Sequence, residues 1–274
     1  MKFAHLVLLL VFIIAACAEE FHKKRELTLN AEGIEELKID CGAGFLKVEG
    51  VKDLEQIQVE AEIRITLDQM DDIDEVLEKY VTLILEKKGN RAELISKFEN
   101  QNSFFRRLFD QGFNGAIDLT IKMPYHLELD IDDGSGSMEI KNTGGSLKID
   151  DGSGDMTITD IAGKVYIDDG SGKLNIEKVG DDIDIDDGSG ETQISDVKGS
   201  VKIDDGSGDI TIKNITGNVR VDDGSGTIDI NSVSGDVIIE NAGSGGVYIE
   251  NVEGKVYRED ENDHRDHDYY DDRE

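Results

Sequence analysis

The sequence predicts an all-β fold: a right-handed parallel β-solenoid of 18-residue coils, with an inserted β-rich cap that carries one short helix. Three observations lead to this prediction. An Asp-Asp-Gly-Ser-Gly cassette recurs at a constant step, five apolar columns keep fixed distances from it, and glycines mark two corners in each repeat. A constant period of this kind is the signature of identical units that stack on one another.

The cassette occurs six times without an insertion. Its first residue is Asp132, Asp150, Asp168, Asp186, Asp204 and Asp222. A degenerate seventh copy, with one residue added, runs from Glu240 to Gly245. Equivalent strands of consecutive repeats are therefore expected to pair in parallel, and the handedness rule for parallel connections favours a right-handed path.

Apolar residues occupy five positions relative to the first Asp of each cassette. Around Asp150 they are Leu147, Ile149, Met156, Ile158 and Ile161. Polar residues stand between most of them, and this period-two alternation predicts two short strands per coil, each with one buried face. Thr143 and Thr192 interrupt the columns. A β-sandwich of hairpins is the alternative, but it does not require a strict period.

Residues 1–16 have the features of a lipoprotein signal peptide. Lys2 precedes the apolar run from Leu6 to Ala16, which is too short to span a bilayer. The run leads to Cys17 through Ile14-Ala15-Ala16, and this sequence resembles the bacterial lipobox. The resemblance implies cleavage before Cys17 and a diacylglycerol on its thiol. An ordinary secretory signal is the alternative.

The lipid on Cys17 would make a membrane the first partner of the chain. Residue 18 is Ala rather than Asp, which implies sorting to the outer membrane if the host has one. Residues 17–25 are expected to form a short lipidated polar tether. The location predicted from these features is the cell envelope.

The presence or absence of the 18-residue period divides the rest of the chain into segments. Residues 26–56 hold a first, degenerate coil, and 57–123 lose the period and are expected to form the inserted cap. Residues 124–256 hold the main solenoid. Residues 257–274 are strongly acidic and predict a disordered tail.

The cap should contain a long strand, a helix and a hairpin. Residues alternate from Ile57 to Ile65, apolar residues take helical spacing from Ile73 to Tyr80, and a hairpin is expected around Gly89-Asn90. Exposed strand edges invite aggregation, so covering the open end of the solenoid is the expected task of this insert.

An aromatic and basic segment stands out within the cap. It contains the candidate contact residues Phe104, Phe105, Arg106, Arg107 and Phe109. In a lipoprotein such a segment is a candidate for contact with lipid or with a partner. The other interpretation is that the segment packs against the end of the solenoid. This interpretation is favoured, because clustered aromatic residues are usually buried.

The two cysteines predict no disulfide, because Cys17 is assigned to lipidation. Cys41 replaces the second Asp of the cassette in the first coil and is expected to act as a small apolar residue.

Stacked cassettes place twelve carboxylates in two columns. They are Asp132, Asp133, Asp150, Asp151, Asp168, Asp169, Asp186, Asp187, Asp204, Asp205, Asp222 and Asp223. Capping of the turns through backbone hydrogen bonds is the favoured interpretation. Weak calcium binding is the alternative, and calcium is then the one cofactor the sequence suggests.

The net charge and the repeated cassette argue against two classes of function. The net charge is −32, which excludes nucleic acid as an expected partner. Every coil carries the same cassette, whereas an active site is singular, so a polysaccharide-acting β-helix enzyme is the least favoured interpretation. No catalytic residue is assigned.

Three features of the sequence carry a family resemblance. They are the opening coil Leu37–Val51, the strand Ile117–Pro124, and the Ser-Gly-Asp repeats at Ser153–Asp155 and Ser207–Asp209. Over about residues 26–256 the chain resembles the bacterial β-strand-repeat "putative adhesin" domain family of unknown function. The resemblance implies a parallel β-solenoid and a surface-exposed role, and it brings no catalytic residues with it.

The function expected from the sequence is an exported, lipid-anchored, non-catalytic module for binding, adhesion or envelope scaffolding. Its partner would be an envelope or surface protein or glycan. A calcium-binding surface or matrix protein is the alternative.

Overall fold

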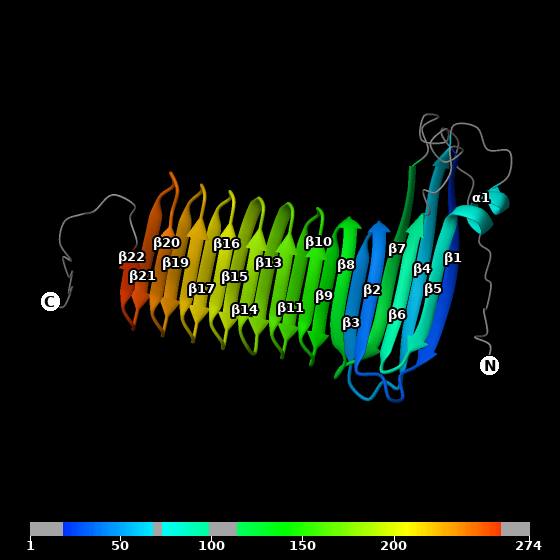
Figure 1. Cartoon of the computed structure of the whole chain (residues 1–274), viewed down its shortest axis with the longest axis horizontal. Helices are drawn as coiled ribbons and strands as arrows, with labels where there is room; N and C mark the ends of the chain where they lie inside the picture. The colour runs from blue at the N-terminus through cyan, green and yellow to red at the C-terminus, as the bar shows by residue number, and fades with distance from the viewer. Residues whose placement is uncertain (1–18, 68–72, 99–113, 259–274) are drawn as a thin grey trace.

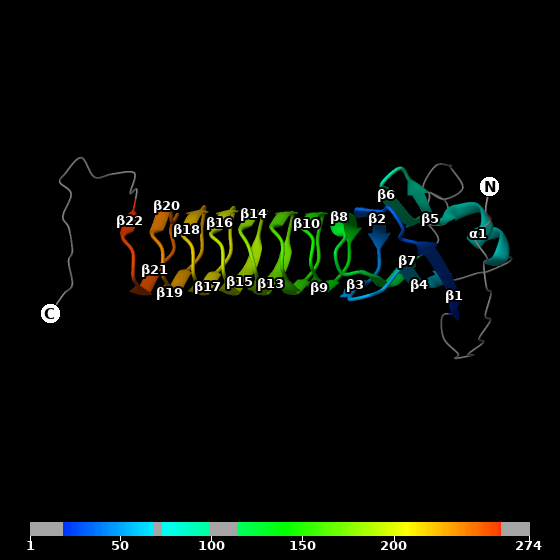
Figure 2. The ribbon, with the colours of Figure 1, turned by 90° about the horizontal axis from the view of Figure 1, so that it is seen from below.

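The protein is a rod built of stacked β-coils, with a cap at one end (Figure 1). The computed structural model describes residues 19–67, 73–98 and 114–258. Two 11-stranded sheets run along the rod and face each other across a narrow core (Figure 2). The predicted parallel β-solenoid of 18-residue coils, with a β-rich cap and a short helix, is confirmed.

We name the two sheets A and B. In spatial order, sheet A contains β1 (Glu19–Asn30), β4 (Gln56–Leu67), β7 (Asn114–Pro124), β3 (Leu46–Val51), β9 (Met138–Thr143), β11 (Met156–Ile161), β13 (Gly172–Val179), β15 (Gly190–Val197), β17 (Ile210–Ile215), β19 (Ile228–Val233) and β21 (Val247–Val252). Sheet B contains β22 (Val256–Arg258), β20 (Val237–Asn241), β18 (Val219–Asp223), β16 (Val201–Asp205), β14 (Ile183–Asp187), β12 (Val165–Asp169), β10 (Leu147–Asp151), β8 (Glu128–Ser135), β2 (Glu36–Ala43), β6 (Arg91–Phe98) and β5 (Val81–Lys88).

Successive coils pair in register. In sheet B, Ile149 lies beside Ile167 and Asp151 beside Asp169, so each strand meets its own equivalent in the next coil. The inward side chains are almost completely buried, as for Ile149 at 1% exposure. Repetition of the same apolar columns therefore produces one continuous core along the rod.

A left-handed residue explains why two inward positions lie three residues apart in the sheet A strands of the 18-residue repeats. Ile158 and Ile161 both face the core, which period-two alternation alone would not allow. Asp160 between them has φ of 60°, and this reverses the direction of the next side chain. The same conformation recurs in each repeat, at Asn142, Lys178, Asp196, Asn214 and Ser232.

The second glycine of the cassette is required by close contact between coils. Gly190 has φ of +158°, and a Cβ at this position would lie 1.7 Å from the carbonyl oxygen of Gly172 in the preceding coil. Such a contact is far inside van der Waals distance. The Gly-Ser-Gly half of the cassette therefore lets the backbone of one turn lie directly on the next.

The inserted segment continues both sheets beyond the first coil. β6 pairs in parallel with β2, and β7 pairs in parallel with β3. Antiparallel β5, β4 and β1 then complete the cap, together with helix α1 (Ile73–Tyr80). Leu77 and Tyr80 of α1 are buried. At this end of the rod the outermost strands of both sheets therefore pair in antiparallel orientation, whereas the strands of the coils pair in parallel.

The tether expected over residues 17–25 differs from the structure, because β1 already begins at Glu19. His22 lies 3.0 Å from Glu62 of β4, and Lys23 lies 3.2 Å from Asp74 of α1. Phe21 packs against the core. These polar residues gain their partners from the insert, which is distant in sequence, so local composition did not reveal the strand.

No described residue covers the core at the other end of the rod. In the last coil Val247, Ile249 and Val252 are only half-buried, whereas their equivalents in earlier coils are buried. The expected tail also begins later than residue 257, because Tyr257 and Arg258 extend sheet B as part of β22.

Replacing Gly190 by Ala should destabilise the solenoid by about 3 kcal/mol, since the new Cβ combines backbone overlap with an unfavourable positive φ. Gly134→Ala is the matched control, because the nearest atom to its Cβ would lie at 3.6 Å. Its expected cost is within about 0.5 kcal/mol. Urea unfolding of both variants measures the difference, and equal losses would contradict the close-contact explanation.

Candidate functional site

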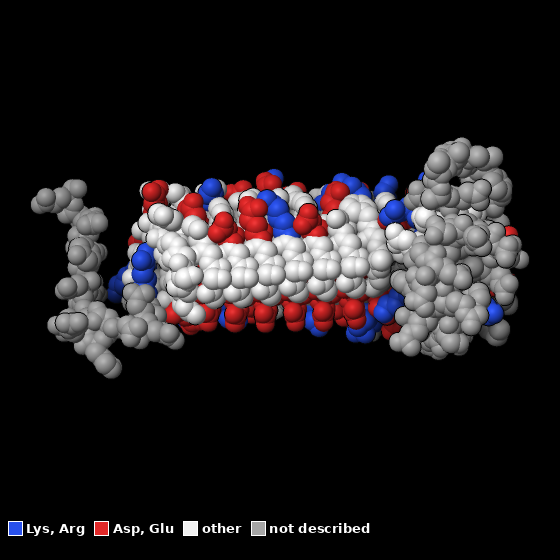
Figure 3. Space-filling view, turned by 90° about the horizontal axis from the view of Figure 1, so that it is seen from above, with Lys and Arg blue, Asp and Glu red and all other residues white. Residues whose placement is uncertain are grey.

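The two Asp residues of each cassette lie on opposite sides of sheet B. The first is exposed in five coils and half-buried in the sixth, at Asp222. The second is buried in all six, with exposures of 3% at Asp133, 2% at Asp151, 2% at Asp169, 1% at Asp187, 2% at Asp205 and 0% at Asp223. We call these six residues the inner Asp column and their exposed neighbours the outer Asp column. Seen from above, the turns of this corner form a band without charged side chains, bordered by rows of acidic residues (Figure 3).

The inner Asp residues cap their own turns. In five coils the Ser N–H two residues further along donates to Oδ1 of the inner Asp, at 2.9 to 3.2 Å. This is the Asx-turn geometry in which a side chain takes the place of a backbone acceptor. The turn-capping function expected from the sequence is therefore performed by the second Asp of the cassette.

Burial shifts the ionisation of the inner column. It raises the pKa of Asp151 to about 7, with the charges of Asp133 and Asp169 adding to the effect. Burial likewise raises the pKa of Asp169 and of Asp205 to about 6, and the charge of Asp187 contributes to both shifts. Carboxyls that are removed from water and stacked on one another hold their protons more tightly.

The ligand arrangement that calcium needs is not formed by the two columns. Calcium takes about six to eight oxygen ligands. Within residues 19–67, 73–98 and 114–258, no group of three or more His, Cys, Asp or Glu side chains is placed to hold one ion. Calcium binding by the twelve Asp residues therefore stays a prediction of the sequence.

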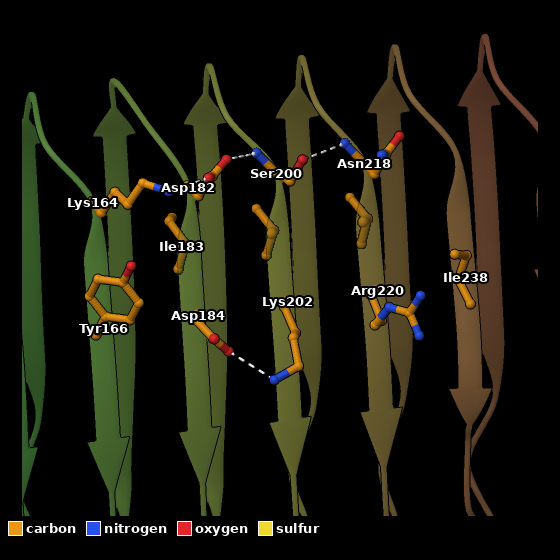
Figure 4. Close-up of a pocket in the computed structure, with 12 residues that line it drawn as sticks. Lys164, Tyr166, Asp182, Ile183, Asp184, Ser200, Lys202, Asn218, Arg220 and Ile238 are labelled. Carbon is orange, nitrogen blue, oxygen red and sulfur yellow. Dashed lines mark hydrogen bonds and ion pairs between the residues drawn. The ribbon is translucent and has the colours of Figure 1, made fainter.

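A shallow groove crosses the outer face of sheet B. It has a volume of about 380 Å³ and is lined by outward side chains of consecutive coils, among them Tyr166, Asp184, Lys202 and Arg220 (Figure 4). A neighbouring hollow of about 300 Å³ shares Tyr166, Asp184 and Lys202 with it. We call this continuous surface the sheet B groove.

Polar contacts between coils hold one edge of the sheet B groove. The Ser200 N–H donates to Oδ1 of Asp182 at 2.9 Å, and the Asn218 N–H donates to Oγ of Ser200 at 3.1 Å (Figure 4). Lys164 pairs with Asp182 at 2.9 Å. In two of these contacts a backbone N–H of one coil bonds to a side-chain oxygen of the preceding coil. The polar side chains along this edge are therefore held at the spacing of the coils.

The floor of the groove is chemically varied. Tyr166 is 45% exposed, so one side of its ring is open to a ligand. Lys202 pairs with Asp184 at 3.1 Å, and Arg220 is paired with Glu240. An open aromatic ring with cationic and anionic groups on either side can stack on a flat ligand and hydrogen-bond to its polar groups.

This groove was not predicted from the sequence. Its signal is one of the outward columns in which the residue changes from coil to coil, two residues before the first Asp of each cassette. The residues in that column are Asp130, Lys148, Tyr166, Asp184, Lys202, Arg220 and Ile238. Variation at this outward position gives each coil a different side chain to present to solvent on sheet B.

Two of the predicted sites lie outside the described residues. They are Cys17 and the segment with Phe104, Phe105, Arg106, Arg107 and Phe109. The described residues contain no helix that is long and apolar enough to cross a membrane.

Comparison with known proteins identifies the fold family. The model of the family described as Toastrack DUF4097 matches residues 52–266. No curated protein matches the chain.

Similar solved structures include a "putative adhesin" from Bacteroides fragilis, with 14% identity, coverage of 87% of this chain and 97% of that chain, and a TM-score of 0.38. A "putative lipid binding protein" from Parabacteroides distasonis has 15% identity, the same coverages and a TM-score of 0.46. A "putative adhesin" from Parabacteroides merdae has 12% identity, coverages of 87% and 96%, and a TM-score of 0.32.

Calcium and magnesium at equal millimolar concentration should raise the thermal unfolding midpoint by the same small amount, because both act on the outer Asp column by screening. Thermal unfolding with each ion and with a chelator measures this. A specific site at a hundred times its Kd would add about 2.7 kcal/mol. A rise seen with calcium alone and reversed by the chelator would contradict the expectation and support calcium binding.

Proposed function

Because the chain belongs to the Toastrack DUF4097 family, we propose that it is an exported, lipid-anchored module that binds a surface or envelope partner and performs no catalysis. The observation that carries this proposal is the sheet B groove, in which an open Tyr166 lies among charged side chains of successive coils. The resemblance stated from the opening coil and the repeats is confirmed by the family match.

The shape of the groove favours binding of an extended ligand. Its residues come from consecutive strands of sheet B, so a chain-like partner lying along the rod meets equivalent positions in several coils. The residues that line it include Tyr, Lys, Arg, Asp and Asn, which offer stacking and hydrogen bonds.

The proposed anchor places the cap next to the membrane. β1 begins at Glu19, two residues after Cys17. Two residues span at most about 7 Å, so a lipid on Cys17 holds the start of β1 close to the bilayer surface. The coils with the sheet B groove lie further along the rod from this point (Figure 1). Their distance from the anchor leaves the groove open to a partner.

Replacing Cys17 by Ser should abolish lipid attachment and release the chain from the membrane, since the thiol is the proposed acceptor. Incorporation of a labelled fatty acid and membrane fractionation measure both effects. Cys41→Ser is the matched control, because Cys41 is buried in the core. Labelled lipid on the Cys17→Ser variant would contradict the anchor.

The groove predicts a second result. Replacing Tyr166, Lys202 and Arg220 together by Ala should weaken binding of the purified chain to cell-envelope preparations by about tenfold or more, because aromatic and Arg side chains carry much of the energy of an interface. Titration of fluorescently labelled protein with envelope vesicles and with isolated envelope glycans measures the affinity.

A control variant with matched chemistry is available on the outer face of sheet A. Tyr248→Ala, Lys141→Ala and Lys213→Ala also remove one Tyr and two cations, and Tyr248 is 63% exposed. Binding should be retained in this control. Equal loss in both variants would point to net charge rather than to the sheet B groove, and binding that neither variant affects would overturn the assignment of the face.

A further inference from the structure

The inner Asp column forms one unbroken row inside the rod. Asp133, Asp151 and Asp169 are register partners in β8, β10 and β12, and Asp187, Asp205 and Asp223 continue the row in β14, β16 and β18. Strand spacing puts consecutive members about 4.8 Å apart. Six carboxyl groups thus stand in a line beneath the surface of the solenoid.

Most of these carboxyls have one oxygen without a partner. In Asp151, Asp169, Asp205 and Asp223, the buried Oδ2 accepts no hydrogen bond from any described residue. In Asp133 both oxygens lack one. Oδ2 of Asp187 accepts the hydroxyl of Thr192 at 3.2 Å. An ionised oxygen in this position would lose its hydration without compensation, which is costly in a protein interior.

The groups packed around the column offer no positive charge. At the cap end the row continues as Cys41 of β2 and Ser96 of β6. From sheet A it faces apolar side chains and, at Asp187, the buried hydroxyl group of Thr192. Every buried polar or charged residue of the described chain is Ser, Thr or Asp, so no Lys, Arg or His is buried with the column. Burial raises the pKa of the Cys41 thiol, so this neighbour of Asp133 is neutral. The other titratable groups that act on the column are the outer Asp column and Asp209, which are negative.

We propose that the inner Asp column is a binding site for hydrogen ions, in which neighbouring carboxyls share protons along the axis of the solenoid. A protonated Oδ2–H donates to a carboxyl oxygen of the adjacent coil. Each carboxyl occupies part of the 4.8 Å spacing, so facing oxygens can approach to about 2.6 Å, the length of a hydrogen bond between an acid and a carboxylate. Each shared proton satisfies an oxygen that otherwise has no partner and removes one buried charge.

Protons fit this row better than a metal ion does. Only two carboxyls flank each gap, whereas calcium needs about six to eight oxygens and magnesium an octahedron. The degenerate seventh copy of the cassette supports a role for protons, because it has a neutral Asn241 in place of the inner Asp. Oδ1 of Asn241 accepts the Gly243 N–H at 3.0 Å. An amide thus makes the same turn contact as the inner Asp. The column of ionisable groups ends where the core is no longer closed.

The ionisation of the column gives the direction of the pH effect. The pKa of Asp151 is raised to about 7 and those of Asp169 and Asp205 to about 6, first by burial. The folded state therefore binds protons more tightly than the unfolded chain, whose Asp residues have a pKa near 3.9. The stabilisation is fully present below about pH 4 and is lost as the pH rises through about 6 to 7.

The test compares two variants of the full-length chain in mild detergent. The inner variant carries Asp151→Asn, Asp169→Asn and Asp205→Asn. The outer variant carries Asp150→Asn, Asp168→Asn and Asp204→Asn, in the same three cassettes and with the same change of net charge. Thermal unfolding midpoints are measured at intervals between pH 5 and pH 8 at constant salt.

The unmodified chain should lose roughly 5–10 °C of its midpoint between pH 5 and pH 8. The inner variant should lose less than half of that and should be the more stable protein at pH 8. The outer variant should keep the full slope. Equal slopes in the unmodified chain and the inner variant would overturn the proposal.

A second measurement does not depend on folding of the variants. Infrared spectra of the unmodified chain at pH 6 should contain the carbonyl band of protonated carboxylic acids, and unfolding at this pH should release protons. Absence of both would overturn the proposal. It would also be overturned if calcium or sodium, rather than acid, raised the midpoint at pH 8 in the unmodified chain but not in the inner variant.

Discussion

Parallel in-register pairing between coils is the constraint on which the rest of the structure depends. Every strand of sheet B from β8 to β18 meets its own equivalent in the next coil. A side chain that fits at one level must therefore fit at every level, on top of its own copy. This explains why Ile recurs at the same core positions and why Gly recurs where one turn lies directly on the next. It also explains how the six inner Asp residues come to be stacked, because the turns in which they stand are themselves stacked.

The same constraint makes the two ends of the rod the difficult places. A stack of coils leaves unpaired strands at each end, and such edges invite association. At the first end the inserted segment resolves this by continuing both sheets and reversing strand direction in β5, β4 and β1. At the other end the last coil leaves Val247 and Ile249 half-buried. The two described ends of the rod therefore differ. The end near the proposed anchor is covered by the cap, and the core residues at the other end are partly exposed.

The proposed binding function depends on the side chains that the stacking does not constrain. Inward columns must be uniform, but the outward column two residues before each cassette changes from Lys148 to Tyr166, Asp184, Lys202 and Arg220. The sheet B groove arises from this variation on a regular surface. The regular spacing holds the varied groups at fixed distances, so a partner meets a rigid pattern and loses little conformational freedom in the protein when it binds.

The repeat by itself determined the solenoid, its 18-residue coils and its apolar core, because each coil packs only against copies of itself and its pattern is complete within one period. Outside the repeat, local patterns predicted α1 and the hairpin of β5 and β6, whose apolar spacing and turn residues lie within a few residues of one another. The strand β1 was not predicted, because its polar residues are matched by Glu62 and Asp74, which only the folded insert brings beside it.

The tertiary structure alone separated the paired Asp residues into an outer, solvated column and an inner, buried one. Two adjacent acids look alike in a sequence, and which of them enters the core depends on the phase of the strand relative to the turn. The same holds for the left-handed Asp160 and its equivalents, which place a second apolar column inside. Tyr166 likewise became part of the sheet B groove only when consecutive coils set Asp184 and Lys202 beside it, because a groove exists between coils and not within any one of them.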